Sequence, residues 1–177
     1  MLNKANENAI QNNQDILFLC QSMTELDLYG TIKSAVCTLD SINHLKNADE
    51  VQKAFDKVSL FMEKDGVFIF DVNTIYKHTQ ILANNIFVYD TDEVYLVWQN
   101  ELDEDTNSVD IYLDFFIDDD GVYYRESEEF TETVYSTEEI SQMLINSNFE
   151  ILGIYDDLSE NMYNDKSERI YFVARKK

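Results

Sequence analysis

Two strand-length runs with an amphipathic segment between them constrain the fold of this chain most strongly. Residues 67–72 (VFIFDV) form an apolar run, and residues 32–39 form a second, weaker one. Between them, apolar residues recur at helical spacing from Val51 to Phe61, after Asn47 at a position typical of a helix N-cap. This strand–helix–strand order predicts an α/β sheet with parallel members.

The two ends of the chain extend the same pattern. Residues 1–13 place their apolar side chains on one helical stripe. Residues 16–20 (ILFLC) form a continuous apolar run, typical of a strand that is buried on both faces. A helix with a capping box is expected to begin at Ser136, and residues 149–155 and 170–174 are expected to form two closing strands.

The middle of the chain has a different character. Residues 94–101, 109–117 and 122–134 are rich in β-forming residues and are separated by clusters of turn residues. They predict a three-stranded antiparallel meander, inserted at about residues 86–135 into a single domain that spans residues 1–177. No internal repeat or linker divides the chain.

The chain is strongly acidic, with 35 acidic and 13 basic residues and a formal net charge of −22. Such a charge repels phosphate backbones, so binding to nucleic acid is not expected. No run of apolar residues is long enough to span a bilayer, and Cys20 and Cys37 lie in apolar segments as reduced thiols would. We therefore expect a soluble, cytoplasmic protein with no membrane partner.

Glycine and proline are scarce. The sequence has no proline and four glycines, and the glycines Gly30, Gly66, Gly121 and Gly153 are far apart. Glycine-rich loops that hold phosphates need closely spaced glycines, so the sequence contains no loop of the Walker or Rossmann type.

The sequence predicts no metal site. Its two histidines, His44 and His78, have no cysteine beside them, and we expect ordinary surface or packing roles for both. The spacing Asp103–x–Asp105–x–Asn107 matches only the first half of a calcium-binding loop, and it lies between predicted strands. It is better explained as a hairpin turn.

Several motifs in order resemble the class I S-adenosylmethionine-dependent methyltransferases of the bacterial small-molecule type. The resemblance covers essentially the whole chain, and no single motif carries it. The motifs are Cys20-Gln21-Ser22-Met23, Asp40-Ser41-Ile42-Asn43-His44-Leu45, the segment from Asp65 to Thr74, Tyr135-Ser136-x-x-Glu139-Ile140, Asn148-Phe149-Glu150-Ile151, and the segment from Glu168 to Ala174.

This resemblance implies a Rossmann-like methyltransferase sheet that lacks its first two strands. In the family, the glycine-rich turn and the ribose-binding acid come before the position that corresponds to Met1 of this chain. We therefore interpret the chain as N-terminally truncated. Residues 16–20 would then lack a neighbour on their inner side, where each orphaned backbone group costs about 1–3 kcal/mol. They could pair with residues 32–39, be covered by a second copy or a partner chain, or belong to a fragment that folds poorly.

The resemblance also implies where the cofactor S-adenosylmethionine would bind. It places Gln21, Ser22, Met23, Leu39 and Asp40 in the cofactor cleft. Ser22 stands where the family usually has an acid that accepts from the adenine amino group, and a hydroxyl makes a weaker contact there.

The acceptor would lie at the same edge of the sheet, near Asn43, His44, Asn73 and Tyr76. The alternative is that these residues only turn the chain and pack. No catalytic residue is assigned. The resemblance predicts a methyltransferase acting on a small-molecule acceptor, although the missing loop argues against independent activity. The alternative is a non-catalytic remnant that serves as an acidic binding or oligomerisation module.

Overall fold

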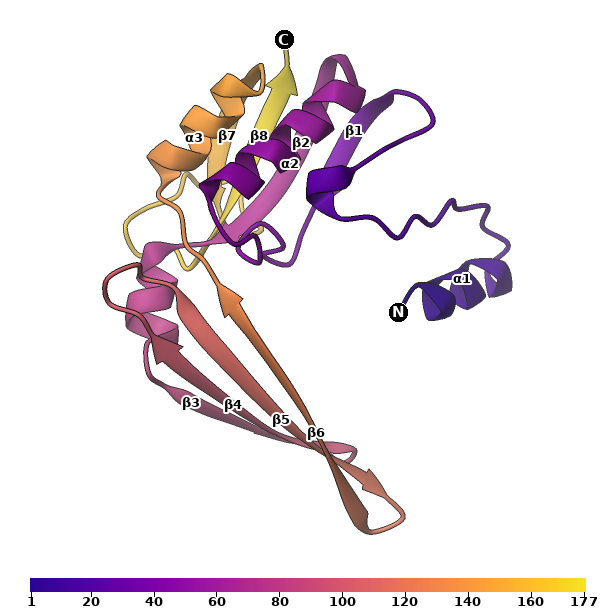
Figure 1. Ribbon diagram of the computed structural model, residues 1–177, viewed down its shortest axis with the longest axis vertical. Helices are drawn as coiled ribbons and strands as arrows, with labels where there is room; N and C mark the ends of the chain where they lie inside the picture. The colour runs from indigo at the N-terminus through magenta and orange to yellow at the C-terminus, as the bar shows by residue number, and fades with distance from the viewer.

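A computed structural model describes all 177 residues and shows two four-stranded sheets (Figure 1). The first sheet has the strand order β1-β2-β8-β7. Its members are β1 (Ile32–Cys37), β2 (Met62–Asn73), β7 (Phe149–Asp156) and β8 (Arg169–Lys176). Strands β1 and β2 are parallel, whereas β8 is antiparallel to both of its neighbours. The predicted α/β sheet with parallel members is therefore confirmed, with one parallel pair.

Two capped helices cover one face of this sheet (Figure 1). Helix α2 (Ala48–Phe61) begins after Asn47, whose side chain accepts a hydrogen bond from the backbone N–H of Glu50 at 3.0 Å. Helix α3 (Thr137–Asn146) begins after Ser136 with the predicted capping box. No helix of the fold is both long enough and apolar enough to cross a membrane.

The core between the helices and the sheet is largely aromatic. Phe55 of α2 packs against Phe68 and Phe70 of β2, with ring centroids 5.9 and 5.1 Å apart. Phe70 stacks on Phe172 of β8 at 5.1 Å, and Phe149 of β7 contacts Phe68. Each of these buried rings contributes about 1.5–3 kcal/mol through the hydrophobic effect.

The second sheet extends away from the first (Figure 1). It is antiparallel, in the order β3 (Ile86–Asp90), β4 (Val94–Leu102), β5 (Val109–Asp119) and β6 (Val122–Glu132). The prediction of three strands was wrong, because β3 also pairs with β4. Four of the five β3 residues are exposed, so this strand has no alternation of polar and apolar residues that a sequence pattern would reveal.

Two connections join the sheets. One is a π-helix, η2 (Lys77–Leu82), which leads from β2 to β3. The other is the segment after β6, where the backbone N–H of Thr133 donates to the carbonyl of Asn43 at 2.7 Å. The carboxyl ends of β1 and β2 lie beside these connections, so the base of the second sheet faces the ligand-binding edge of the first.

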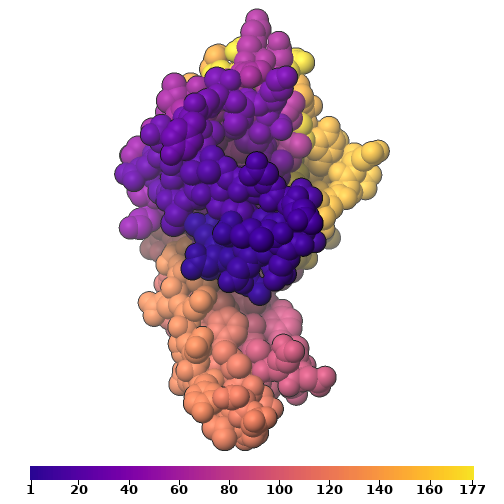
Figure 2. All heavy atoms as spheres, turned by 90° about the vertical axis from the view of Figure 1, so that its right-hand side faces the viewer, coloured from indigo at the N-terminus to yellow at the C-terminus, as the bar shows by residue number.

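The N-terminal segment contradicts one prediction. Helix α1 (Leu2–Gln11) forms as expected, but residues 16–20 make no strand, and the side chain of Leu17 is 69% exposed. In Figure 1, α1 lies apart from both sheets, and Figure 2 shows this segment on the face turned toward the viewer. A strand buried on both faces needs neighbours on each side. None is present, because β1 pairs with β2 alone.

Candidate functional site

A strained turn follows β1. Leu39 and Asp40 both have positive φ angles, of 61° and 48°. This region is unfavourable for residues with a side chain and costs on the order of 1–3 kcal/mol per residue. Such strain persists only where the surrounding structure holds it in place. The turn lies at the carboxyl end of a strand, which is where α/β sheets bind ligands.

A buried ion pair holds this turn. The backbone N–H of Asp40 donates to Oδ2 of Asp71 at 3.1 Å. Arg169, the first residue of β8, donates through Nη1 to the same oxygen of Asp71 and through Nη2 to Oδ2 of Asp40, the latter at 2.5 Å. Asp71 is fully buried. The guanidinium therefore shares its single positive charge between the two carboxylates and ties the turn to the sheet.

Asn73, the last residue of β2, extends the network to the second sheet. Its Nδ2 donates to Oδ2 of Asp40 at 2.9 Å and to Oε2 of Glu132 at 2.8 Å. Its Oδ1 accepts from Nζ of Lys77 at 2.9 Å. Because one amide bonds both carboxylates, Asp40 and Glu132 are held side by side although they come from different parts of the fold.

Asn43 forms a second link between the sheets. Its side chain is buried and accepts from the backbone N–H of Asn73 at 2.9 Å through Oδ1. Its Nδ2 donates to the carbonyl of Thr133 at 3.0 Å. With both ends of the amide bonded to backbone groups, Asn43 positions its neighbours. Its predicted place near the acceptor stays a prediction.

The charges of this network shift the pKa values of three members. Burial lowers the pKa of Lys77, and the nearby Arg169 lowers it further. Burial alone would lower the pKa of Arg169, but Asp40 and Asp71 outweigh it and raise that pKa. Burial alone would raise the pKa of Glu132, but contacts with His78 and Asn73 hold it below the ordinary value. The Glu132 carboxylate therefore stays ionised at neutral pH in spite of its burial.

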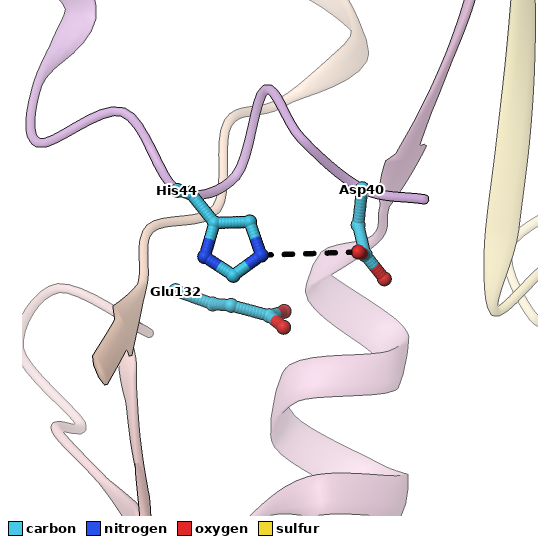
Figure 3. A group of neighbouring side chains, drawn as sticks. All are labelled: Asp40, His44 and Glu132. Atoms are coloured by element: carbon cyan, nitrogen blue, oxygen red, sulfur yellow. Dashed lines mark ion pairs between the residues drawn. The ribbon is translucent and has the colours of Figure 1, made fainter. Parts of the chain in front are cut away.

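His44 lies at the rim of the network (Figure 3). Its Nε2 is 4.0 Å from Oδ1 of Asp40, and its ring centroid is 5.1 Å from that of Phe130. It lines a hollow of about 460 Å³ together with Lys46, Phe130, Thr131 and Thr133. The imidazole is 41% exposed, so it can meet a ligand that enters from solvent.

A larger, mostly apolar cavity of about 490 Å³ lies beside β1. Gln21, Ser22 and Met23 are at its margin, and Ala35 to Thr38, Ser41 and Ile42 continue the wall toward α2. Gln21 is already bonded to the backbone of Asp27, and the Ser22 hydroxyl caps the short helix η1 (Met23–Glu25).

These lining residues fit one end of a nucleoside cofactor. An apolar cavity of this size suits a flat aromatic base, and the hydroxyl of Ser22 is a polar group at its margin. None of the four glycines lines this cavity, and no basic side chain does. The lining therefore offers neither a basic side chain nor a glycine-rich cradle for a carboxylate or a phosphate.

The predicted site residues thus divide into three places. Gln21, Ser22 and Met23 line the large cavity, whereas Leu39, Asp40, Asn43, His44 and Asn73 surround the turn and its network. Tyr76 lies elsewhere, in a hollow of about 180 Å³ that it shares with Tyr135.

Sequence reasoning missed the cation and the acid that complete the network. Arg169 was assigned only to a closing strand, and Glu132 only to the meander. One signal was available for Arg169, since it is a basic residue directly before an apolar run in a chain with few bases. Nothing in the local pattern around Glu132 or His78 distinguishes them from their neighbours.

Comparison with known proteins identifies relatives along nearly the whole chain. No family model matches. A Geobacillus sp. (strain WCH70) protein, provisionally described as a methyltransferase, is 32% identical over 162 residues, which is 91% of this chain and 66% of the relative. YqeM of Bacillus subtilis (strain 168), described in the same provisional terms, is 28% identical over 168 residues. The chain spans about two thirds of the length of these relatives.

Solved structures show the same fold. A crystal structure of an S-adenosylmethionine-dependent methyltransferase from Clostridium acetobutylicum ATCC 824 matches 99% of this chain and 70% of its own, with a TM-score of 0.93 and 33% identity. CalS10, an amino pentose methyltransferase from Micromonospora echinaspora solved with S-adenosylmethionine bound, matches 89% of this chain and 63% of its own, with a TM-score of 0.68 and 16% identity. The predicted Rossmann-like methyltransferase fold is thereby confirmed.

Proposed function

The chain belongs to the S-adenosylmethionine-dependent methyltransferases, and on that premise we propose that it takes part in methyl transfer to a small-molecule acceptor. The observation that carries the proposal is the strained turn at Leu39 and Asp40, held by Asp71 and Arg169 beside the apolar cavity. Backbone strain of this kind clusters at ligand-binding and active sites, and a buried ion pair stabilises a fold no better than apolar packing would.

S-adenosylmethionine is the cofactor that this family membership implies. We propose that its adenine end lies in the cavity lined by Gln21, Ser22 and Met23. Leu39 and Asp40 directly follow Thr38, which also lines the cavity, and would contact the cofactor from the turn. When bound, the cofactor supplies an electrophilic methyl group. The methionine end finds no cradle among the residues that line this cavity, so its binding groups lie outside them.

The residues of this chain orient the reacting groups and exclude water, and they do not transfer protons. Transfer of a methyl group from a sulfonium is an in-line displacement that needs alignment and a dry pocket more than a strong base. Arg169 and Asn73 fix the Asp40 turn, and Asn43 fixes Asn73. The acceptor would enter through the hollow beside His44, with Asn73 behind the turn, whereas Tyr76 lines a separate hollow.

The test is calorimetric titration of the purified chain with S-adenosylhomocysteine, the product form of the cofactor. We expect saturable one-to-one binding. Thr38→Trp, which fills the cavity, should weaken binding at least tenfold. Ser34→Trp is the matched control, because Ser34 is an exposed residue of β1, the strand that leads to Thr38, and does not line the cavity. No heat up to millimolar ligand, from protein shown to be folded by circular dichroism, would overturn the proposal.

A second candidate function rests on the open edge of the first sheet. Strand β1 pairs with β2 alone, and the side chain of Val36 on it is 67% exposed. An unpaired edge can bond to another chain. A non-catalytic member of the family could serve as an acidic binding or oligomerisation module, through a second copy or a partner chain at this edge. Sedimentation analysis tests pairing with a second copy, because a monomer at micromolar concentration excludes that form.

A further inference from the structure

Three side chains with metal-binding atoms converge between the two sheets. Asp40 and His44 follow β1, and Glu132 ends β6 (Figure 3). One donor atom from each lies within 4.8 Å of the others. We propose that Asp40, His44 and Glu132 form a binding site for one divalent transition-metal ion, which ties the antiparallel sheet to the turn after β1.

The network leaves one oxygen of each carboxylate free. Asn73 bonds Oδ2 of Asp40 and Oε2 of Glu132. Arg169 also uses Oδ2 of Asp40. Oδ1 of Asp40 and Oε1 of Glu132 accept no hydrogen bond from the protein, and Oδ1 lies 4.0 Å from Nε2 of His44. The side chains of Arg169 and Asn73 therefore fix the carboxylates from one side, as partners of metal ligands commonly do.

His78 is a second, independent observation beside Glu132: a fully buried ring nitrogen without a hydrogen-bond partner faces this carboxylate. It is fully buried on η2, and its Nδ1 lies 2.9 Å from the carbonyl of Asn107, so Nδ1 must be the donor. Its Nε2 makes no hydrogen bond, although it lies 3.3 Å from Oε2 of Glu132. Unless Nε2 carries a proton or a cation lies nearby, its lone pair faces a carboxylate oxygen in a buried place. A histidine that donates one N–H to a backbone carbonyl also has the usual arrangement of a metal ligand.

The donor set indicates which ions would bind. Two carboxylate oxygens and an imidazole nitrogen suit zinc and neighbouring transition metals, whereas magnesium prefers oxygen ligands alone. Ligand atoms about 2.0–2.2 Å from one tetrahedral ion lie about 3.3–3.6 Å from each other. The donor atoms here lie within 4.8 Å. Binding therefore requires the three side chains to draw together, and the half-exposed His44 is the member with the most freedom to move.

An ion at this place would connect parts of the fold that otherwise meet through a few hydrogen bonds. Asp40 and His44 belong to the first sheet's loop, while Glu132 belongs to the second sheet. Binding would therefore restrict the second sheet relative to the first. It would also raise the thermal unfolding midpoint, because the ion binds the folded state only.

The experiment uses the full chain, which is first treated with a chelator and then freed of the chelator. Zinc chloride is titrated by calorimetry in a buffer with millimolar magnesium, which saturates nonspecific cation-binding sites on the acidic surface. We expect one equivalent of zinc to bind and the unfolding midpoint to rise. His44→Ala, in which the lost side chain is exposed, should fold normally and weaken binding at least tenfold. Asp119→Asn is the matched control, because it removes a charge from an acidic turn outside the site, and it should change the affinity less than twofold.

Nitrogen NMR gives a second readout that does not depend on methyl transfer. The chain has two histidines, so both rings can be assigned. Zinc should shift Nε2 of His44. The proposal is overturned if zinc does not bind saturably, if His44→Ala binds as well as the unchanged chain, or if neither ring responds. In those cases Asp40, His44 and Glu132 form no metal site.

Discussion

Replacing Arg169 by methionine tests whether the buried ion pair holds the turn after β1. The guanidinium is 22% exposed, and it donates to Asp40 and to the fully buried Asp71. The other oxygen of Asp71, Oδ1, has no hydrogen-bond partner. In the variant, the Asp71 carboxylate keeps only the backbone N–H of Asp40 as a donor, so a buried charge is left nearly uncompensated.

Removing one partner of a buried pair costs about 3–5 kcal/mol. For a domain of this size, that is a large part of a total stability of about 5–15 kcal/mol, and it lowers the unfolding midpoint by roughly 6–20 °C. The free energy of unfolding is measured by urea titration. The matched control is Arg175→Met on the same strand, because Arg175 and its partner Glu150 are 44% and 49% exposed and lie 2.9 Å apart. Because solvent screens that exposed pair, its loss should lower the free energy of unfolding far less than the loss of the buried pair.

A double variant separates the buried charge from lost packing. Asp71→Asn combined with Arg169→Met removes both charges, and it should recover more than half of the stability that the single Arg169 variant loses. If Arg169→Met loses no more stability than Arg175→Met, or if the double variant is as unstable as the single one, then the ion pair does not hold the turn.

Four further predictions concern single positions. Ser136→Ala removes the α3 cap and should lower the free energy of unfolding in urea by about 1 kcal/mol; no change would mean that the cap is replaced by water. Phe70→Ala should cost about 3–5 kcal/mol in the same assay, and a loss below 1 kcal/mol would contradict its place in the aromatic core. Burial raises the pKa of Tyr135 to about 12, so the stability from its neutral phenol is full below pH 10 and is lost as the pH rises toward 12. Stability curves between pH 9 and 12 should show this slope in the unchanged chain and not in Tyr135→Phe. Val36→Lys on the open edge should change stability by less than about 0.5 kcal/mol, and a larger loss would show that the edge is covered.

The helices and most strands could be predicted because their signals are local. The caps at Asn47 and Ser136 and the apolar run from Val67 to Val72 depend on residues within one element, and the structure has all three. The strand expected at residues 16–20 failed for the opposite reason. Its apolar run matches a buried strand, but a strand needs partners, and β1 does not pair with it.

The site could be predicted only in part. Asp40 and Asn73 were placed correctly at strand ends, because an α/β sheet brings such ends together. The contacts that give them their geometry join distant residues, such as Arg169 and Asp40, which are 129 positions apart. No periodicity or spacing encodes such a contact, and the same holds for Glu132, which reaches Asn73 from the second sheet.

The open edge of β1 bears on how copies of the molecule behave in concentrated solution. A row of backbone N–H and C=O groups without strand partners, with Val36 exposed beside it, is a template for stacking one copy on another. The net charge of −22 opposes this contact, because every copy repels every other. Charge repulsion at this level would keep the edges apart in dilute buffer, whereas high salt, or a pH near 4.1, would remove that protection and favour aggregation.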